Sequence, residues 1–96
     1  MDEQAQLRMD ADMAEATGHI SDTVCQIVDA VTPGETCHGL RAYRHGDGWG
    51  VSFHCRLPGQ ISLVDAHNKC GQIEAQLRRR VPILDRIIIH AEPRPS

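Results

Sequence analysis

The chain has 96 residues, of which 41% are hydrophobic and 24% are charged, and its formal net charge is −3. This length predicts one domain with a single modest core. The slightly acidic balance does not suggest nucleic acid as a partner, because nucleic-acid-binding domains usually carry a basic stripe. The sequence has neither a long apolar run nor an apolar leader, so we expect no membrane insertion and a soluble, cytoplasmic protein.

Acidic side chains are concentrated at the start of the chain. Residues 1–22 carry six of them against one arginine. Such a run is usually a solvated face or arm. We therefore interpret residues 1–19 as an acidic N-terminal extension, either an arm or a helix extension, and expect the domain to occupy residues 20–94.

The first helix is expected from Ile20 to Val31, because apolar residues recur there at helical spacing. The Pro33-Gly34 pair should end it. Gly18 makes a continuation of this helix toward the N-terminus less favourable, because glycine disfavours helix interiors.

A hairpin should follow. Residues 36–44 and 49–57 have the pattern of strands, and His45-Gly46-Asp47-Gly48 between them is a strong turn signal. Strict alternation in the second strand predicts two faces. One face carries Trp49, Val51, Phe53, Cys55 and Leu57, and the other carries Ser52, His54 and Arg56.

A second helix is expected to begin after Ser62, which starts a capping box with Asp65. Its predicted buried stripe is Leu63, Ala66, Cys70, Ile73 and Leu77. Pro82 should end the helix, and residues 83–92 then form a third strand. Ile87, Ile89 and Ala91 should face the core, with Ile88, His90 and Glu92 on the opposite side.

The predicted order is helix, strand, strand, helix, strand. This order predicts an α+β fold of the ferredoxin-like or metallochaperone-like kind, with both helices on one face of a three-stranded sheet. The other face of the sheet would be left uncovered. A second copy of the chain could cover it, because most oligomers of soluble proteins are symmetric dimers.

The expected register brings chemistry-bearing residues together. If the hairpin turn is centred near Gly46, His38 lies opposite His54 and Cys37 lies opposite Cys55. The two cysteines should then point toward the helices. His38, His54, His90 and Glu92 should share the uncovered face with Leu40, Ala42 and Ile88.

Imidazole and carboxylate groups are suitable ligands for zinc. A single histidine on a strand is more often a surface or hydrogen-bonded residue, so the hypothesis of a metal site depends on the convergence of several. His67, at the edge of the second helix, could reach the rim of the sheet, whereas His19 and His45 are expected to be solvated.

No cysteine pair has the CxxC spacing of a zinc ribbon or a redox motif. The four cysteines are expected to be thiols, most of them buried. Three of them are kept as additional candidate metal ligands: Cys37, Cys55 and Cys70.

Three segments carry a family resemblance: CHGLRAYRHGDGWGVSFHCRL, LVDAHNKCGQIEAQLRRR and IIIHAEP. Together they resemble the cytoplasmic C-terminal domain of cation diffusion facilitator transporters, over roughly residues 20–94. The resemblance implies a homodimer with a two-metal zinc site at its interface. It implies that His38 and His54 bind one ion, and that His67 and His90 bind the second.

Glu92 stands where the family has an aspartate that touches both ions. Its extra methylene makes one ion per subunit as credible as two. The transmembrane domain of these transporters has no counterpart in this sequence. We therefore expect a free-standing regulatory domain that does not transport ions alone, with a membrane metal transporter as a candidate partner.

The resulting hypothesis is a dimeric protein that binds Zn²⁺, or Cd²⁺ or another divalent transition metal, as a sensor, buffer or chaperone. A structural dimerisation or regulatory module of a metal transporter is the alternative. A zinc hydrolase with Glu92 as general base is a third reading. The sequence favours a protein that is not an enzyme, because it has no evident pocket-forming loops and only three aromatic residues to line a cleft.

Overall fold

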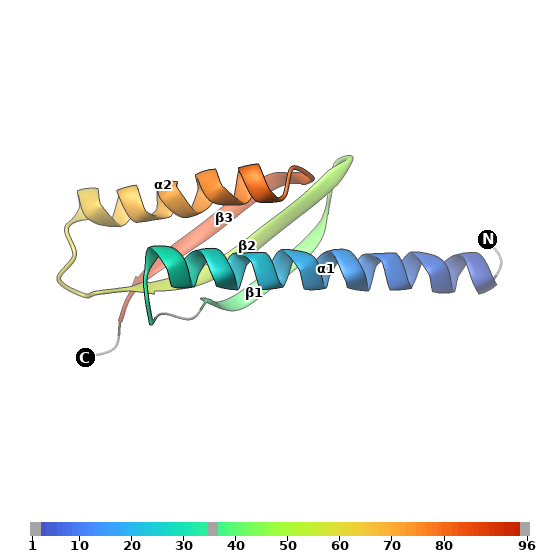
Figure 1. Ribbon diagram of the computed structural model, residues 1–96, viewed down its shortest axis with the longest axis horizontal. Helices are drawn as coiled ribbons and strands as arrows, with labels where there is room; N and C mark the ends of the chain where they lie inside the picture. The colour runs from blue at the N-terminus through green and yellow to red at the C-terminus, as the bar shows by residue number, and fades with distance from the viewer. Residues whose placement is uncertain (1–2, 35–36, 95–96) are drawn as a thin grey trace.

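The structure, a computed structural model, describes residues 3–34 and 37–94, with side chains from Asp12 onward. Five elements follow one another: α1 (Glu3–Val31), β1 (Cys37–His45), β2 (Gly48–Leu57), α2 (Leu63–Arg80) and β3 (Leu84–Pro93). β2 is the central strand, antiparallel to β1 and parallel to β3. Both helices lie on the same side of the sheet (Figure 1). The predicted α+β, metallochaperone-like arrangement is confirmed. Thr36, expected in the first strand, lies outside the described residues.

α1 extends well beyond the sheet toward the N-terminus (Figure 1). Gly18 does not interrupt it, and the helix is continuous across the boundary that we expected after residue 19. Met13 is exposed, and complete burial begins at Ile20. The division of the chain at this point remains a prediction. None of the helices in the described part of the chain is both long and apolar enough to cross a membrane.

The core lies between the helices and one face of the sheet. α1 contributes four fully buried residues, Ile20, Val24, Ile27 and Val28, and α2 contributes Ile73 and Leu77. They pack with the inward side chains of β2, which are Trp49, Val51, Phe53, Cys55 and Leu57. The alternation predicted for this strand is confirmed. Burial of each large aliphatic side chain stabilises the fold by about 1.5–3 kcal/mol.

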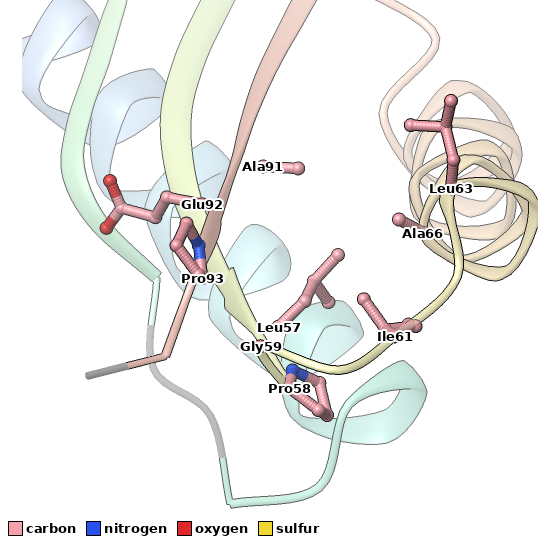
Figure 2. Close-up of a pocket in the computed structure, with 9 residues that line it drawn as sticks. All are labelled: Leu57, Pro58, Gly59, Ile61, Leu63, Ala66, Ala91, Glu92 and Pro93. Atoms are coloured by element: carbon pink, nitrogen blue, oxygen red, sulfur yellow. The ribbon is translucent and has the colours of Figure 1, made fainter. Parts of the chain in front are cut away.

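α2 begins at the predicted cap, where the Ser62 hydroxyl accepts a hydrogen bond from the Asp65 backbone N–H at 3.0 Å. The stripe predicted to be buried is only partly so. Leu63 is 87% exposed, which makes its assignment to the core wrong. Leu63 continues the apolar spacing of α2. The first turn of the helix stands apart from β3, however, so no sheet residue covers the Leu63 side chain (Figure 2).

The hairpin register is as predicted at one end and different at the other. Cys37 lies opposite Cys55, and His38 lies opposite His54. Nearer the turn, however, Ala42 lies opposite Val51 and not opposite Gly50. The turn is therefore centred half a residue later than expected, and an irregularity between His38 and Arg41 restores the register.

Gly39 lies within this irregularity and has a φ of +62°, which glycine adopts without strain. The extra residue in β1 changes the parity of the strand beyond it. Leu40 and Ala42 consequently pack against the core, and the expectation that they lie on the uncovered face is wrong. Ile88 is paired with Ser52, on the face that we expected for it.

Candidate metal centre

Three histidines form a row across the uncovered face of the sheet, one from each strand. His54 of β2 is paired with His38 of β1 and with His90 of β3. The ring centroids of His38 and His54 are 5.2 Å apart, and those of His54 and His90 are 4.9 Å apart. The rings are nearly parallel, with interplanar angles of 22° and 21°. Strand alternation and the register together place them in this row.

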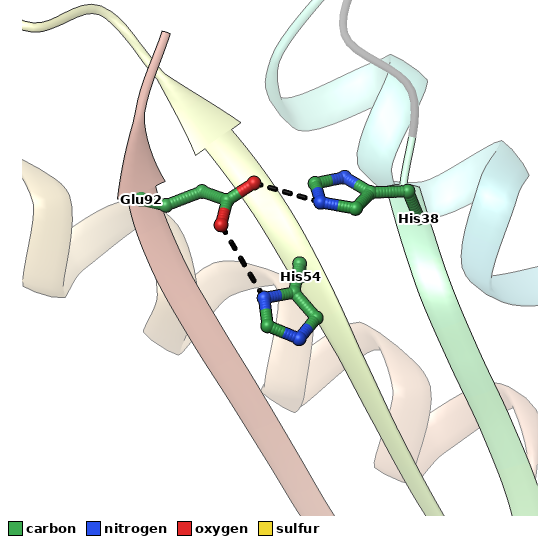
Figure 3. Close-up of side chains that lie close together, drawn as sticks. All are labelled: His38, His54 and Glu92. Atoms are coloured by element: carbon green, nitrogen blue, oxygen red, sulfur yellow. Dashed lines mark ion pairs between the residues drawn. The ribbon is translucent and has the colours of Figure 1, made fainter.

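Glu92 follows His90 by two residues on β3, and its carboxylate lies beside His38 and His54 (Figure 3). One of its carboxylate oxygens lies 2.8 Å from His38 Nε2, and the other lies 3.4 Å from His54 Nδ1. The carboxylate thus reaches across β2 and contacts an imidazole from each of the other two strands. All three side chains are partly solvent-exposed, so an ion could reach them without a change of fold.

Another residue of this face, Arg56, also contacts the Glu92 carboxylate. Its Nε lies 3.5 Å from Glu92 Oε1, because Arg56 is paired with Glu92 across β2 and β3. The sequence pattern alone assigned Arg56 no role. Its position two residues after His54, on the same face, was the signal that could have identified it.

The donor set of His38, His54 and Glu92 fits a divalent transition metal. Their ligand atoms all lie within 4.8 Å of one another. A tetrahedral zinc ion with bonds of about 2.0–2.2 Å holds its ligands about 3.3 Å apart. The atoms must therefore approach one another by up to about 1.5 Å to bind such an ion. Three protein ligands leave one coordination position for water or for a group from another chain.

The other predicted ligands do not join this group within one chain. His90 stacks on His54 and is exposed, but its nitrogens are not part of the cluster. His67 lies on α2, which packs against the opposite face of the sheet, and is exposed. Cys37, Cys55 and Cys70 are also outside the cluster. Their role as ligands remains a prediction.

The two histidines expected to be solvated differ from each other. His19 is exposed on α1. His45, at the end of β1, contacts Asp85 of β3 through Nδ1 and Oδ2 at 2.8 Å. This contact joins the end of β1 to β3, away from the cluster.

Among the four cysteines, Cys55 is fully buried, Cys37 and Cys70 are partly buried, and Cys25 is exposed. The Sγ atoms of Cys25 and Cys37 lie 2.9 Å apart, a contact that the sequence pattern did not predict. Partial burial, the hydrogen bond to Cys25 and the charge of that neighbour raise the pKa of Cys37 to about 12. Burial also raises the pKa of Cys70. Both groups are therefore protonated thiols at neutral pH when no metal is bound.

Beside Glu92, an open pocket of about 230 Å³ lies between the start of α2 and the end of β3 (Figure 2). Apolar side chains form most of its wall, among them Leu57, Ile61, Leu63, Ala66 and Ala91. The Glu92 carboxylate points away from this pocket and toward the histidines (Figures 2 and 3). The pocket and the histidine cluster therefore lie on different sides of the third strand.

Comparison with known proteins points to one family. Residues 16–94 match the family described as the cytoplasmic domain of cation efflux proteins. Over 71 residues the chain is 35% identical to the cation-efflux pump FieF of Escherichia coli and of Shigella boydii serotype 18. This alignment covers 71% of the chain and 23% of each pump. The chain thus spans about a quarter of the length of these relatives.

Solved structures of the MamM CTD share the fold. One variant has a TM-score of 0.70 and 18% identity, covering 81% of this chain and 98% of that one. A nickel form has a TM-score of 0.70 and 16% identity, covering 81% and 99%. A cadmium form has a TM-score of 0.69 and 18% identity, covering 80% and 96%. At these identities the likeness establishes the arrangement of helices and strands.

Proposed function

The chain belongs to the family of cation efflux protein cytoplasmic domains, and we propose that it is a dimeric metal-binding protein. It takes up Zn²⁺, or a similar divalent transition metal such as Cd²⁺, through His38, His54 and Glu92. Its role is that of a sensor, a buffer or a chaperone for the ion. We infer a binding role and no catalytic one, because the matched family is a domain of ion-efflux proteins.

One observation carries the proposal: three candidate ligand side chains, one from each strand, converge on one point. His38 and His54 each lie within 3.4 Å of a different oxygen of Glu92. The two imidazoles and the carboxylate form a mixed nitrogen and oxygen donor set, which suits zinc better than it suits magnesium or calcium. Adjacent thiols would shift the preference toward softer ions such as cadmium.

A second copy of the chain could complete the coordination. The cluster lies on the sheet face that neither helix covers, and within the described residues it offers three candidate ligands. By resemblance to the family, His67 and His90 would serve a second ion once two copies are together. An ion that binds one dimer arrangement more tightly shifts the population toward it, which is how a sensor would signal.

The names of similar proteins support this class of ligand. FieF is a cation-efflux pump, and MamM CTD structures include nickel, copper and cadmium forms. We propose that this chain also acts in the cytoplasm on such ions. A membrane cation transporter is its proposed partner, because the matched family is a domain of such proteins.

Isothermal titration calorimetry of the metal-free chain with Zn²⁺ and then Cd²⁺ tests the proposal. We expect saturable binding that His54→Ala weakens by more than about tenfold, since loss of even an outer-shell partner of a metal site costs 10–100-fold in affinity. His19→Ala is the matched control, because His19 is exposed on α1, away from the cluster. Sedimentation velocity with and without metal measures the change in dimer population.

Two results would contradict the proposal. Equal zinc affinities for His54→Ala and His19→Ala would rule out the cluster as the site. The absence of saturable binding to the unmodified chain at neutral pH would instead favour a purely structural dimerisation module. Dimerisation that is independent of metal, together with tight binding at the cluster, would favour a buffer over a sensor.

A further inference from the structure

Two cysteines that are distant in sequence meet between α1 and β1. Cys25 lies on α1, and Cys37 is the first residue of β1. Their Sγ atoms are 2.9 Å apart. A disulfide bond is about 2.0 Å long, so the sulfurs need to move by less than about 1 Å to reach bonding distance. The two elements already pack against each other.

The two thiols differ in accessibility. Cys25 is exposed, and Cys37 is half-buried. The other cysteines are placed differently: Cys55, opposite Cys37 in the sheet, is completely buried in the core, and Cys70 lies on α2. An incoming reagent therefore meets Cys25 first, and Cys37 is the thiol within reach of whatever forms there.

We propose that Cys25 and Cys37 form a dithiol site that reacts with low-molecular-weight disulfides such as glutathione disulfide. Cys25 attacks one sulfur of the reagent, breaks its disulfide bond and releases one glutathione. Cys37 then attacks Cys25 Sγ, breaks the mixed disulfide and releases the second glutathione. The two cysteines are oxidised to one disulfide, glutathione disulfide is reduced, and the two thiol protons end on the two glutathiones.

The product would link α1 to the residue that precedes His38. It would close the connection between the helix and the first strand, which restricts the unfolded chain and stabilises the folded one. The reaction itself requires no metal. The proposed dithiol reaction can therefore be tested independently of metal binding by the histidine cluster.

The test uses the full chain, reduced and then held in a chelating buffer without oxygen. After incubation with glutathione disulfide, intact-mass spectrometry should show the loss of two hydrogen atoms, and peptide mapping should find Cys25 joined to Cys37. Cys37→Ser should accumulate a glutathione adduct on Cys25 that is not resolved. Cys25→Ser should lose the internal disulfide, and Cys70→Ser should behave as the unmodified chain does.

Three outcomes would overturn the proposal. The first is a crosslink that joins Cys37 to Cys55 in the unmodified chain. The second is a glutathione adduct that persists on the unmodified chain as long as on Cys37→Ser. The third is a Cys25→Ser variant that forms an internal disulfide as fast as the unmodified chain does. The mapping of the unmodified chain is decisive even if a serine variant folds poorly.

Discussion

The imidazole of His54 lies against that of His38 at a ring-centroid distance of 5.2 Å, with a strand irregularity immediately beyond His38. The alignment depends on Gly39, whose positive φ accommodates the extra residue. A Cβ atom at Gly39 would lie 2.9 Å from His54 Cδ2. Gly39 therefore affects both the backbone of β1 and the position of the His54 ring in the candidate metal site.

Gly39→Ala should lower the free energy of unfolding by about 1–2 kcal/mol, because alanine is strained at positive φ. It should also weaken zinc binding, since the new methyl group displaces the His54 ring. Urea denaturation and calorimetry measure the two effects. Gly71→Ala is the control: its added methyl group meets no atom within 4 Å, and alanine in a helix stabilises by up to about 1 kcal/mol. Similar losses in both variants would disprove this role of Gly39.

Arg56→Gln should strengthen metal binding, in contrast to every ligand substitution. Arg56 Nε lies 3.5 Å from Glu92 Oε1, so its positive charge competes with the ion for the carboxylate. Both groups are partly exposed, and exposed ion pairs contribute roughly 0.2–1 kcal/mol. This corresponds to an affinity gain of about 1.4- to fivefold in low salt, read from zinc titration. A loss of affinity would mean that Arg56 orients the carboxylate instead of competing for it.

Glu92→Gln should reduce zinc affinity by about tenfold or more, because the neutral amide keeps the shape of the side chain but loses its charge. The folded chain should remain intact, since Glu92 is partly exposed and its contacts are with surface side chains. Circular dichroism checks the fold, and competition with a chromophoric chelator measures affinity. Arg86→Gln, an exposed change elsewhere on β3, is the control. Unchanged affinity in Glu92→Gln would remove Glu92 from the ligand set.

Phe53→Ala should destabilise the fold by about 3–5 kcal/mol, because Phe53 is completely buried at the centre of the core. Leu63→Ala should change stability by less than about 0.5 kcal/mol, since Leu63 is 87% exposed. Chemical denaturation of the metal-free chain compares the two. A large loss of stability in Leu63→Ala would show that this residue is covered in solution, as it would be in an interface between copies.

The sequence alone predicted the order of the elements and the two faces of β2. Apolar spacing located the helices, the Ser62 cap fixed the start of α2, and alternation along β2 separated Phe53 from His54. These features follow from local geometry, because a strand alternates its side chains and a helix repeats every 3.6 residues. The three family motifs also predicted the fold correctly, and the family match over residues 16–94 agrees with them.

Only the tertiary structure showed which residues of different elements contact one another. The irregularity at Gly39 sends Ala42 toward the core, and pairing of β3 with β2 brings Arg56 and Glu92 together. The packing of α1 against β1 places Cys25 beside Cys37. Such contacts depend on strand register and helix placement, and these are set by many weak interactions between residues far apart in the chain. Periodicity along β2 places Arg56 on the face of His54 but does not show that Arg56 contacts Glu92, and periodicity gives no sign of the contact between Cys25 and Cys37.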